Sequence, residues 1–388
     1  MTNKPTFHEA LSFWLKLGFI SFGGPAGQIA ILHEFLVEKK KWISESKFLH
    51  ALNYCMLLPG PEAQQLATYM GWLLHGVRGG LAAGILFILP SMFILLGLSI
   101  LYVSFGNTPI VFAMFNGLKP AVVAIVILAL IKIAKKSLRS AFHFFIAGAA
   151  FVCLFFFKVS FPLIILVAIL LSLLLRRYLP SYLATSRSNG PAGTVNESDY
   201  FINRNSMLPQ GFYTPGLMAM KVLAFCLLWA APFVAFYFLS SDYAFWKQLS
   251  VFFSQAAFVT FGGAYSVLPY VAQVSVEKYQ WLSNGQMLDG LALGETTPGP
   301  LIMVLVFVGF MAGYNYFNYS LLAGSVGLLA TTWYTFLPSF LFILIGAPLI
   351  ERTQENVRVR EMLEMVSAAV VGVILSLCLY LAAAVLFP

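Results

Sequence analysis

Two short motifs, each present twice, interrupt otherwise apolar stretches of this sequence. Gly-Gly occurs at 23–24 and 262–263, and Pro-Gly-Pro occurs at 59–61 and 298–300. Proline removes a helical hydrogen bond and glycine relaxes the backbone, so both motifs should break helices. After each Pro-Gly-Pro a half-helix would begin, and its N–H groups and partial positive charge favour an anion. The candidate substrate-binding residues are Gly23, Gly24, Pro59, Gly60, Pro61, Gly262, Gly263, Pro298, Gly299 and Pro300.

Four charged residues lie in or beside the apolar stretches, where charge is costly and often functional. Lys16 and Lys119 could bind a dianion, although Lys16 could instead extend its ammonium to the membrane surface. Glu62 falls in the first turn of a half-helix, where it could order the anion site or pair with a lysine. Glu295 precedes the second Pro-Gly-Pro, and we expect it to carry a coupling proton. The alternative for Glu295 is a carboxylate that is simply hydrogen-bonded within the bundle.

The sequence contains no recognisable metal, cofactor or catalytic motif. Its four cysteines are far apart in apolar surroundings, without metal-ligand spacing. The pair His33-Glu34 lacks the second histidine that a zinc-protease motif requires, and no nucleotide-binding or nucleophile fingerprint is present. We therefore expect a protein that is not an enzyme and uses neither metal nor cofactor.

The composition identifies the environment that must hold these residues. Of 388 residues, 60% are hydrophobic and 10% are charged, too few polar side chains to cover a soluble globule of this size. In a lipid bilayer the backbone must satisfy itself internally, and the apolar runs lack the alternation of a barrel, so helices are expected. The net charge of +8 fits basic loops at one membrane face rather than nucleic-acid binding.

Hydrophobic periodicity predicts an all-α polytopic membrane protein with about eleven helical elements. A polar stretch at 177–215 reads as a linker between two domains, 1–176 and 216–388. The elements are expected at 10–35, 46–76, 80–104, 109–133, 140–157, 160–176, 216–239, 248–273, 286–313, 320–347 and 362–387.

An internal repeat relates the two domains. A shift of 239 residues superposes both glycine motifs, Trp42 on Trp281 and both Pro-Gly-Pro motifs, and a shift of 248 superposes Leu-Pro-Ser at 89–91 on 337–339. One isolated break could be a packing kink, but two motifs recurring at one spacing favour a site. If every element crosses once, seven crossings separate the copies and the second is inverted. Lys39, Lys40 and Lys41 oppose this count, because it leaves them on the outer face. Either the first or second element re-enters without crossing, or this loop violates the rule.

The motifs carry a family resemblance. FISFGGPAGQIA at 19–30, LLPGPEAQQLATYMGW at 57–72 and ILPS at 88–91 resemble the N-terminal signature of the chromate ion transporter family. FVTFGGAYSVLPYV at 258–271 and ETTPGPLIMVLVFVGF at 295–310 are similar to its second domain. The resemblance implies a multi-pass carrier of the bacterial inner membrane that exports chromate, a tetrahedral dianion similar to sulfate. The copies differ at Pro25 against Ala264 and at Glu62 against Leu301, so an identical site in both is not expected.

The leading hypothesis is a secondary transporter or antiporter that moves chromate by alternating access at a midplane site, as a monomer or a homodimer. A carrier of sulfate or another oxyanion is the alternative within the same class. A membrane-embedded enzyme acting on lipid intermediates, with Glu62 and Glu295 as acid and base, is the alternative from another class. A purely structural membrane scaffold is a third reading, and the repeated helix breaks argue against it.

Overall fold

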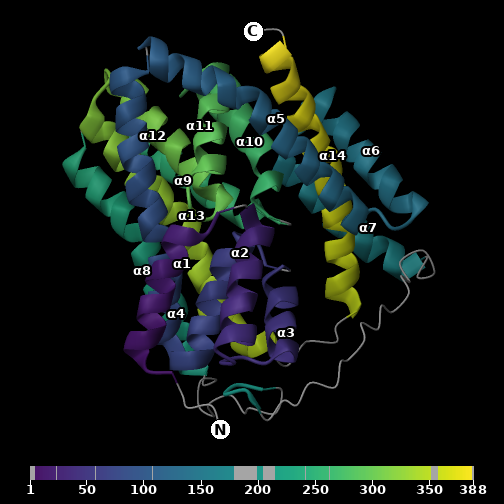
Figure 1. Ribbon diagram of the computed structural model, residues 1–388. Helices are drawn as coiled ribbons and strands as arrows, with labels where there is room; N and C mark the ends of the chain where they lie inside the picture. Colours follow the sequence, from purple (N-terminus) through teal and green to yellow (C-terminus); the bar gives the residue numbers. More distant parts are fainter. Residues whose placement is uncertain are drawn as a thin grey trace.

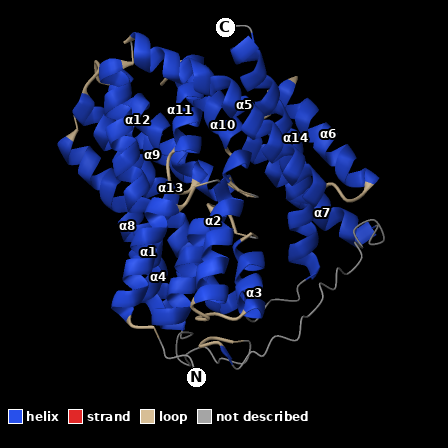
Figure 2. Cartoon of the chain, viewed as in Figure 1, coloured by secondary structure: helices blue, strands red, loops and turns tan. Residues whose placement is uncertain are grey.

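The fold is helical throughout the part of the chain that the computed structural model describes, apart from one bridge between Ile43 and Ile202 (Figure 2). Five of the described helices are long and apolar enough to cross a membrane: Glu62–Phe105, Pro109–Lys135, Gly216–Leu239, Leu321–Gly346 and Glu364–Ala383. The predicted all-α polytopic class is confirmed. The described residues are 5–22, 24–56, 58–106, 108–178, 199–203, 215–240, 242–261, 263–350 and 357–386.

The predicted elements appear close to their expected positions, and the four that contain a motif are divided at it. The α-helices are α1 (Phe7–Ile20), α2 (Gly24–His33), α3 (Glu45–Cys55), α4 (Glu62–Phe105), α5 (Pro109–Ser137), α6 (Ala141–Phe155), α7 (Phe161–Tyr178), α8 (Pro215–Leu239), α9 (Tyr243–Val259), α10 (Leu268–Ala272), α11 (Asn284–Thr296), α12 (Val304–Tyr316), α13 (Leu321–Ile350) and α14 (Val357–Leu386). Short π- or 3-10-helical segments adjoin them: η1 (Glu34–Lys39), η4 (Ala264–Ser266), η5 (Gln273–Lys278) and η6 (Leu301–Met303).

Each motif turns the chain back instead of letting it cross. In the hairpin of α1 with α2 and η1, the ring centroids of Phe13 and Phe35 lie 3.7 Å apart. The ammonium of Lys40 lies 2.8 Å from the carboxylate of Glu9, so the chain returns to the end where it began. In the hairpin of α11 and α12, the amide of Asn315 donates to the carbonyl of Trp281 at 2.8 Å. The elements that contain a motif are therefore hairpins, the form expected of elements that re-enter without crossing.

Small residues allow the next helix of each copy to pack closely. Helix α4 contains a reversal at His75 and Gly76, whose dihedral angles are non-helical, so its two parts run antiparallel. An added Cβ at Gly80 would lie 3.0 Å from the carbonyl oxygen of Thr68 across this hairpin. In the second copy α12 and α13 make the same pair, with Gly309 against Gly327. Helix α4 of the first copy thus corresponds to two helices, α12 and α13, of the second copy.

Backbone geometry repeats between the copies. The π-helical segments η1 and η5 begin 239 residues apart, at 34 and 273. Lys41 and Gln280, also 239 residues apart, both adopt left-handed φ values, 52° and 51°. Such values are uncommon for residues other than glycine, so their recurrence is not a matter of composition. The two repeated halves are confirmed at the level of the backbone.

The hairpins of the two copies occupy opposite ends of the molecule. Figure 1 shows α1 to α3 and the first part of α4 in the lower half and α9 to α12 of the second copy in the upper half, which the second part of α4 also reaches. Helix α14 packs against α5, α6 and α7, and we call these four helices the flanking bundle. Helix α8 packs instead on α13, where the indole of Trp333 donates to the carbonyl of Leu228 at 3.0 Å.

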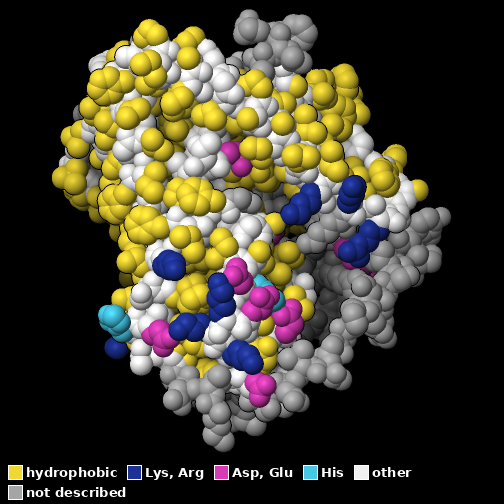
Figure 3. All heavy atoms as spheres, in the orientation of Figure 1, with side chains coloured by type: hydrophobic (Ala, Val, Ile, Leu, Met, Phe, Trp, Pro, Cys, Tyr) yellow, Lys and Arg dark blue, Asp and Glu magenta, His cyan; other side chains and the backbone are white. Residues whose placement is uncertain are grey.

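The basic loop at Lys39 to Lys41 lies at the end of the molecule that holds the N-terminus. Lys40 contacts Glu9 there, and the ring of His75 hydrogen-bonds the carbonyl of Pro5 at 2.9 Å. Figure 3 shows charged side chains gathered at this lower end, over α1 to α3, with a second group of Lys and Arg side chains at the right of the middle, whereas most of the remaining visible face is hydrophobic. Because the first elements turn back, this loop lies at the same end as the start of α1.

Most of the predicted linker, 177–215, lies outside the described residues. Its described part, 199–203, attaches to the loop before α3. There the N–H of Ile202 donates to the carbonyl of Trp42 at 2.9 Å, and the N–H of Ser44 donates to the carbonyl of Ile202 at 2.8 Å. The division into domains at 176 and 216 stays a prediction.

Candidate functional site

The tips of the four hairpins meet between the copies. The N–H of Gly60, in the first Pro-Gly-Pro, donates to the carbonyl of Thr260 at 2.7 Å. The N–H of Gly299, in the second Pro-Gly-Pro, donates to the carbonyl of Ser21, also at 2.7 Å. Each copy thus satisfies a backbone acceptor exposed by the break in the other. We call this meeting point the tip junction.

Both central glycines are required by their geometry. Gly60 and Gly299 have φ values of 124° and 105°, in a region that favours glycine. A Cβ at Gly60 would lie 2.6 Å from the hydroxyl of Ser339, and a Cβ at Gly299 would collide with the side chain of Ser91. Larger residues at either position would therefore force the two copies apart.

The two serines extend the exchange between copies. The hydroxyl of Ser91, from the Leu-Pro-Ser of the first copy, donates to the carbonyl of Pro298 in the second. Ser339, its repeat mate, lies against Gly60 of the first copy. Its hydroxyl is buried and has no hydrogen-bond partner among the described residues. The junction is thus symmetric in position but not in bonding.

Buried glutamine side chains line the same place. The amide nitrogen of Gln28 donates to the carbonyl of Gly299 at 2.5 Å, and that of Gln65 donates to the carbonyl of Pro59 at 2.7 Å. Within the described structure, the side-chain oxygens of both glutamines are buried without a donor. An unpartnered buried oxygen is costly, so these groups indicate a place where a proton, water or ligand would be accommodated.

The two carboxylates predicted for the site lie at different tips. Glu62 begins α4, and an added Cβ on Gly263 of the second copy would lie 3.7 Å from its carboxylate. Glu295 is half-buried near the end of α11 and accepts a hydrogen bond from the hydroxyl of Tyr265 at 2.8 Å. The repeat mate of Glu295 is Met56, so the first copy has no counterpart of this bond.

The two predicted lysines lie away from the junction contacts. Lys16 is on the exposed side of α1. Lys119 lies 3.4 Å from the carboxylate of Asp289 and donates to the side chain of Asn116 at 2.9 Å. Asp289 is about two helical turns before the end of α11, so this pair belongs to a second location.

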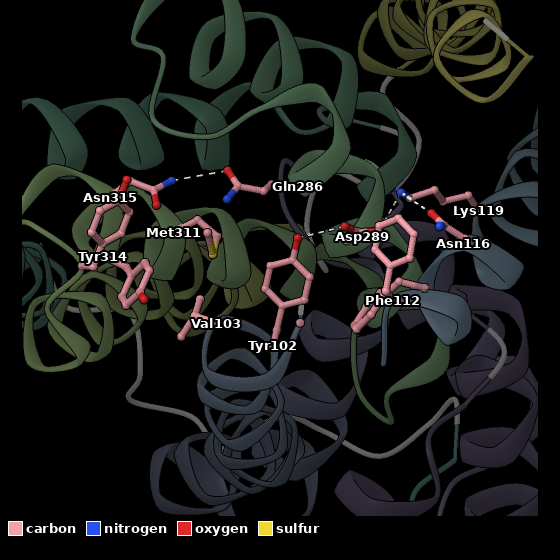
Figure 4. Close-up of a pocket in the computed structure, with 13 residues that line it drawn as sticks. Tyr102, Val103, Phe112, Asn116, Lys119, Gln286, Asp289, Met311, Tyr314 and Asn315 are labelled. Atoms are coloured by element: carbon pink, nitrogen blue, oxygen red, sulfur yellow. Dashed lines mark hydrogen bonds and ion pairs between the residues drawn. The ribbon is translucent and has the colours of Figure 1, made fainter. Parts of the chain in front are cut away.

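That second location is a pocket of about 320 Å³ between the copies. Figure 4 shows Tyr102 and Lys119 approaching Asp289 from opposite sides, with Gln286 and Asn315 joined to each other farther along. The hydroxyl of Tyr102 donates to Asp289 at 2.8 Å. The pocket is lined from the first copy by α4 and α5 and from the second by α11 and α12.

The predicted motif residues fall into two groups. Gly23 and Gly262 lie outside the described residues. The described motif residues all lie at the hairpin tips: Gly24, Pro59, Gly60, Pro61, Gly263, Pro298, Gly299 and Pro300.

Sequence reasoning missed several polar residues of the two locations. Ser21 and Thr260 are repeat mates, and the one hydroxyl residue directly before each Phe-Gly-Gly was a usable signal. Ser91 and Ser339 were visible in the repeated Leu-Pro-Ser, but only the fold shows which chain segment they meet. Asp289 had no such signal, because its repeat mate is His50.

Comparisons with known proteins agree on one family. The model of a family described as chromate transporter matches residues 8–173 and 247–388. A chromate transport protein of Pseudomonas aeruginosa is 32% identical over 95% of this chain and 79% of its own length. One of Cupriavidus metallidurans is 27% identical, with 97% and 83% covered, and an uncharacterized transporter of Methanocaldococcus jannaschii is 27% identical, with 96% and 84% covered. No solved structure matches the chain.

Proposed function

The chain belongs to the chromate transporter family, and from that premise we propose that it is a secondary transporter that exports chromate across a bacterial inner membrane. The tip junction is the proposed binding site. The observation that carries the proposal is the exchange of backbone hydrogen bonds between Gly60 and Thr260 and between Gly299 and Ser21. This exchange brings hairpin tips from both copies to one place.

The electrostatics of the tips suit a dianion. Helix α4 begins at Glu62, and after the second Pro-Gly-Pro the chain begins η6 at Leu301 and continues into α12. Each such start carries about half a positive charge, so the two together supply about one. Helix α2, which begins at Gly24 within the first Gly-Gly, adds a third start. Backbone N–H groups at these starts would hydrogen-bond the oxyanion in place of water.

Alternating access is the proposed mechanism. The two sets of hairpins approach the junction from opposite ends, which supports an inverted relation between the copies. The basic residues Lys39, Lys40, Lys41 and Arg78 lie on the lower hairpins or at their turns, so we propose by the positive-inside rule that this end faces the cytoplasm. The junction would then be reached from one side at a time.

The negative charge of the substrate determines which direction of transport needs the least coupling to another ion. Moving one charge across 100 mV is worth about 2.3 kcal/mol, so expelling a dianion from a negative interior gains about 4.6 kcal/mol. Uptake would have to offset the same amount with protons or sodium. Glu295, next to the junction and bonded to Tyr265, is the proposed carrier of a coupling proton.

The test is chromate transport by the purified protein in liposomes. We expect labelled chromate to accumulate in vesicles when the proposed export direction points inward, and a membrane potential that is positive inside to speed it. Excess sulfate should compete in part, because both ions are tetrahedral dianions. Sulfate transport with no chromate transport would assign the sulfate alternative, and movement of neither ion by folded protein would refute the proposal.

A further inference from the structure

Equivalent surfaces of the two copies differ in exposure. Leu49 on α3 and Leu288 on α11 are repeat mates, yet Leu49 is 45% exposed and Leu288 is 2% exposed. One turn later, Asn53 is exposed whereas its mate Ala292 is fully buried. The same backbone position therefore faces open space in the first copy and packed protein in the second.

The flanking bundle explains the difference. Helix α5 packs against α11, and α14 packs against α10 and η4, so the bundle leans on the hairpins of the second copy. No comparable packing joins α14 to α3, or α5 to α2, among the described helices. Figure 1 shows the ribbon of α14 apart from that of α3 at the lower right.

The ion pair of Lys119 and Asp289 lies where the bundle packs on the second copy, in the wall of the pocket described above. It joins α5 of the bundle to α11 of the second copy, and the hydroxyl of Tyr102 on α4 also binds Asp289. Asp289 is 7% exposed, so an unpaired carboxylate there would be strongly disfavoured. This pair must separate before an anion can pass between α5 and α11.

The repeat identifies the pair that should close the opposite face. The mate of Asp289 is His50 on α3. The 248-residue shift places Asn116 and Lys119, which both line the pocket, on Glu364 and Ser367 of α14. His50 and Glu364 are thus a base and an acid at the positions that would meet if α14 closed on α3. Glu364 now interacts electrostatically with His143 of α6, inside the bundle.

Resting on the proposed function, we propose that Lys119–Asp289 and His50–Glu364 are mutually exclusive gates, and that this structure is open toward the N-terminal end. Movement of the flanking bundle from the second copy to the first would break one pair and form the other. The anion would reach the tip junction along α2 and α3 in the present state. After the movement it would leave between α5 and α11.

Cysteine accessibility tests the present state. In a background with the four native cysteines replaced by serine, Leu49→Cys and Leu288→Cys form a matched pair at equivalent positions. A membrane-impermeant maleimide is applied to the N-terminal side without chromate. It should modify Leu49→Cys at least about tenfold faster than Leu288→Cys, because Leu49 is exposed and Leu288 is buried. Equal rates, or faster modification of Leu288→Cys, would overturn the assignment of the open side.

Cross-linking tests the exchange of gates. The double variants Lys119→Cys/Asp289→Cys and His50→Cys/Glu364→Cys are treated with a short bifunctional thiol reagent, and folding is checked by size-exclusion chromatography. Without chromate the first pair should cross-link and the second should not. During chromate turnover the second should appear as the first declines, and either cross-link should stop transport. A His50–Glu364 pair that never cross-links in an active carrier would overturn the proposal.

The two proposals fail separately. If the protein moves sulfate but no chromate, and the cross-links exchange during sulfate turnover while Leu49→Cys and Leu288→Cys still differ in accessibility, the substrate assignment is wrong and the gates stand. If chromate is transported while the accessibility of the two positions is equal, the gate model is wrong and the transporter stands.

Discussion

The two copies share their backbone and differ in what surrounds it. Gly60 and Gly299 have nearly the same φ, and each donates to a carbonyl of the opposite copy. Around these shared atoms the side chains diverge: Glu62 stands opposite Leu301, and Glu295 stands opposite Met56. The two copies thus keep the same helix breaks, while the side chains around the breaks have diverged. The comparison separates what is needed to build the junction from what is needed to use it.

The shared glycines should give the largest effect. Gly60→Ala and Gly299→Ala each add a methyl group where φ is positive and a serine of the other copy occupies the space. Strain of about 1–3 kcal/mol plus the steric conflict should reduce chromate transport about tenfold or more. Transport in liposomes and thermal unfolding in detergent measure both consequences.

Gly97→Ala is the matched control, because an added Cβ there meets nothing within 4 Å. It should transport at close to the unmodified rate. If Gly60→Ala and Gly299→Ala differ greatly from each other, the junction is less symmetric than its backbone indicates.

Charge reversal at the closed face should give the next largest effect. Lys119→Asp places a second carboxylate next to buried Asp289 and should reduce transport about tenfold. The double variant Lys119→Asp/Asp289→Lys restores opposite charges and should recover activity to within about threefold, as expected for coupled sites. Failure of the double variant to recover any activity would contradict a role that depends on pairing.

The carboxylate present only in the second copy should control the response to pH. Glu295→Gln removes the proposed proton site but can still accept the hydrogen bond from Tyr265. We expect transport to continue while its dependence on a pH gradient disappears. Tyr265→Phe, which keeps the carboxylate, should retain the dependence, and an unchanged response in Glu295→Gln would remove Glu295 from coupling.

Lys16 should give the smallest effect. Its side chain is on the exposed face of α1, and its mate in the second copy is Gln255. Lys16→Gln makes the first copy resemble the second and should change the chromate transport rate by less than about twofold, as for other surface substitutions. A large loss of chromate transport would indicate that Lys16 contributes to the binding site.

The sequence was sufficient to predict the repeat, the breaks and most helix limits, because glycine and proline act through the local backbone. It could not show that the broken elements turn back, since a hairpin and a crossing have the same hydrophobic pattern. The misfit of Lys39 to Lys41 with the expected orientation was the one visible sign. The sequence also could not predict long-range partners. Nothing near Lys119 in the sequence indicates Asp289, which lies 170 positions later (289 minus 119).

The bonds that join the tips come from peptide groups, not from side chains. A peptide N–H and carbonyl are present at nearly every position, so substitution by any residue other than proline leaves these groups in the chain. Each half can therefore accumulate its own substitutions and still keep its hydrogen bonds to the other half. Neither half completes its own tips, however, so the two must be inherited and folded together, whether as one polypeptide or as two that assemble.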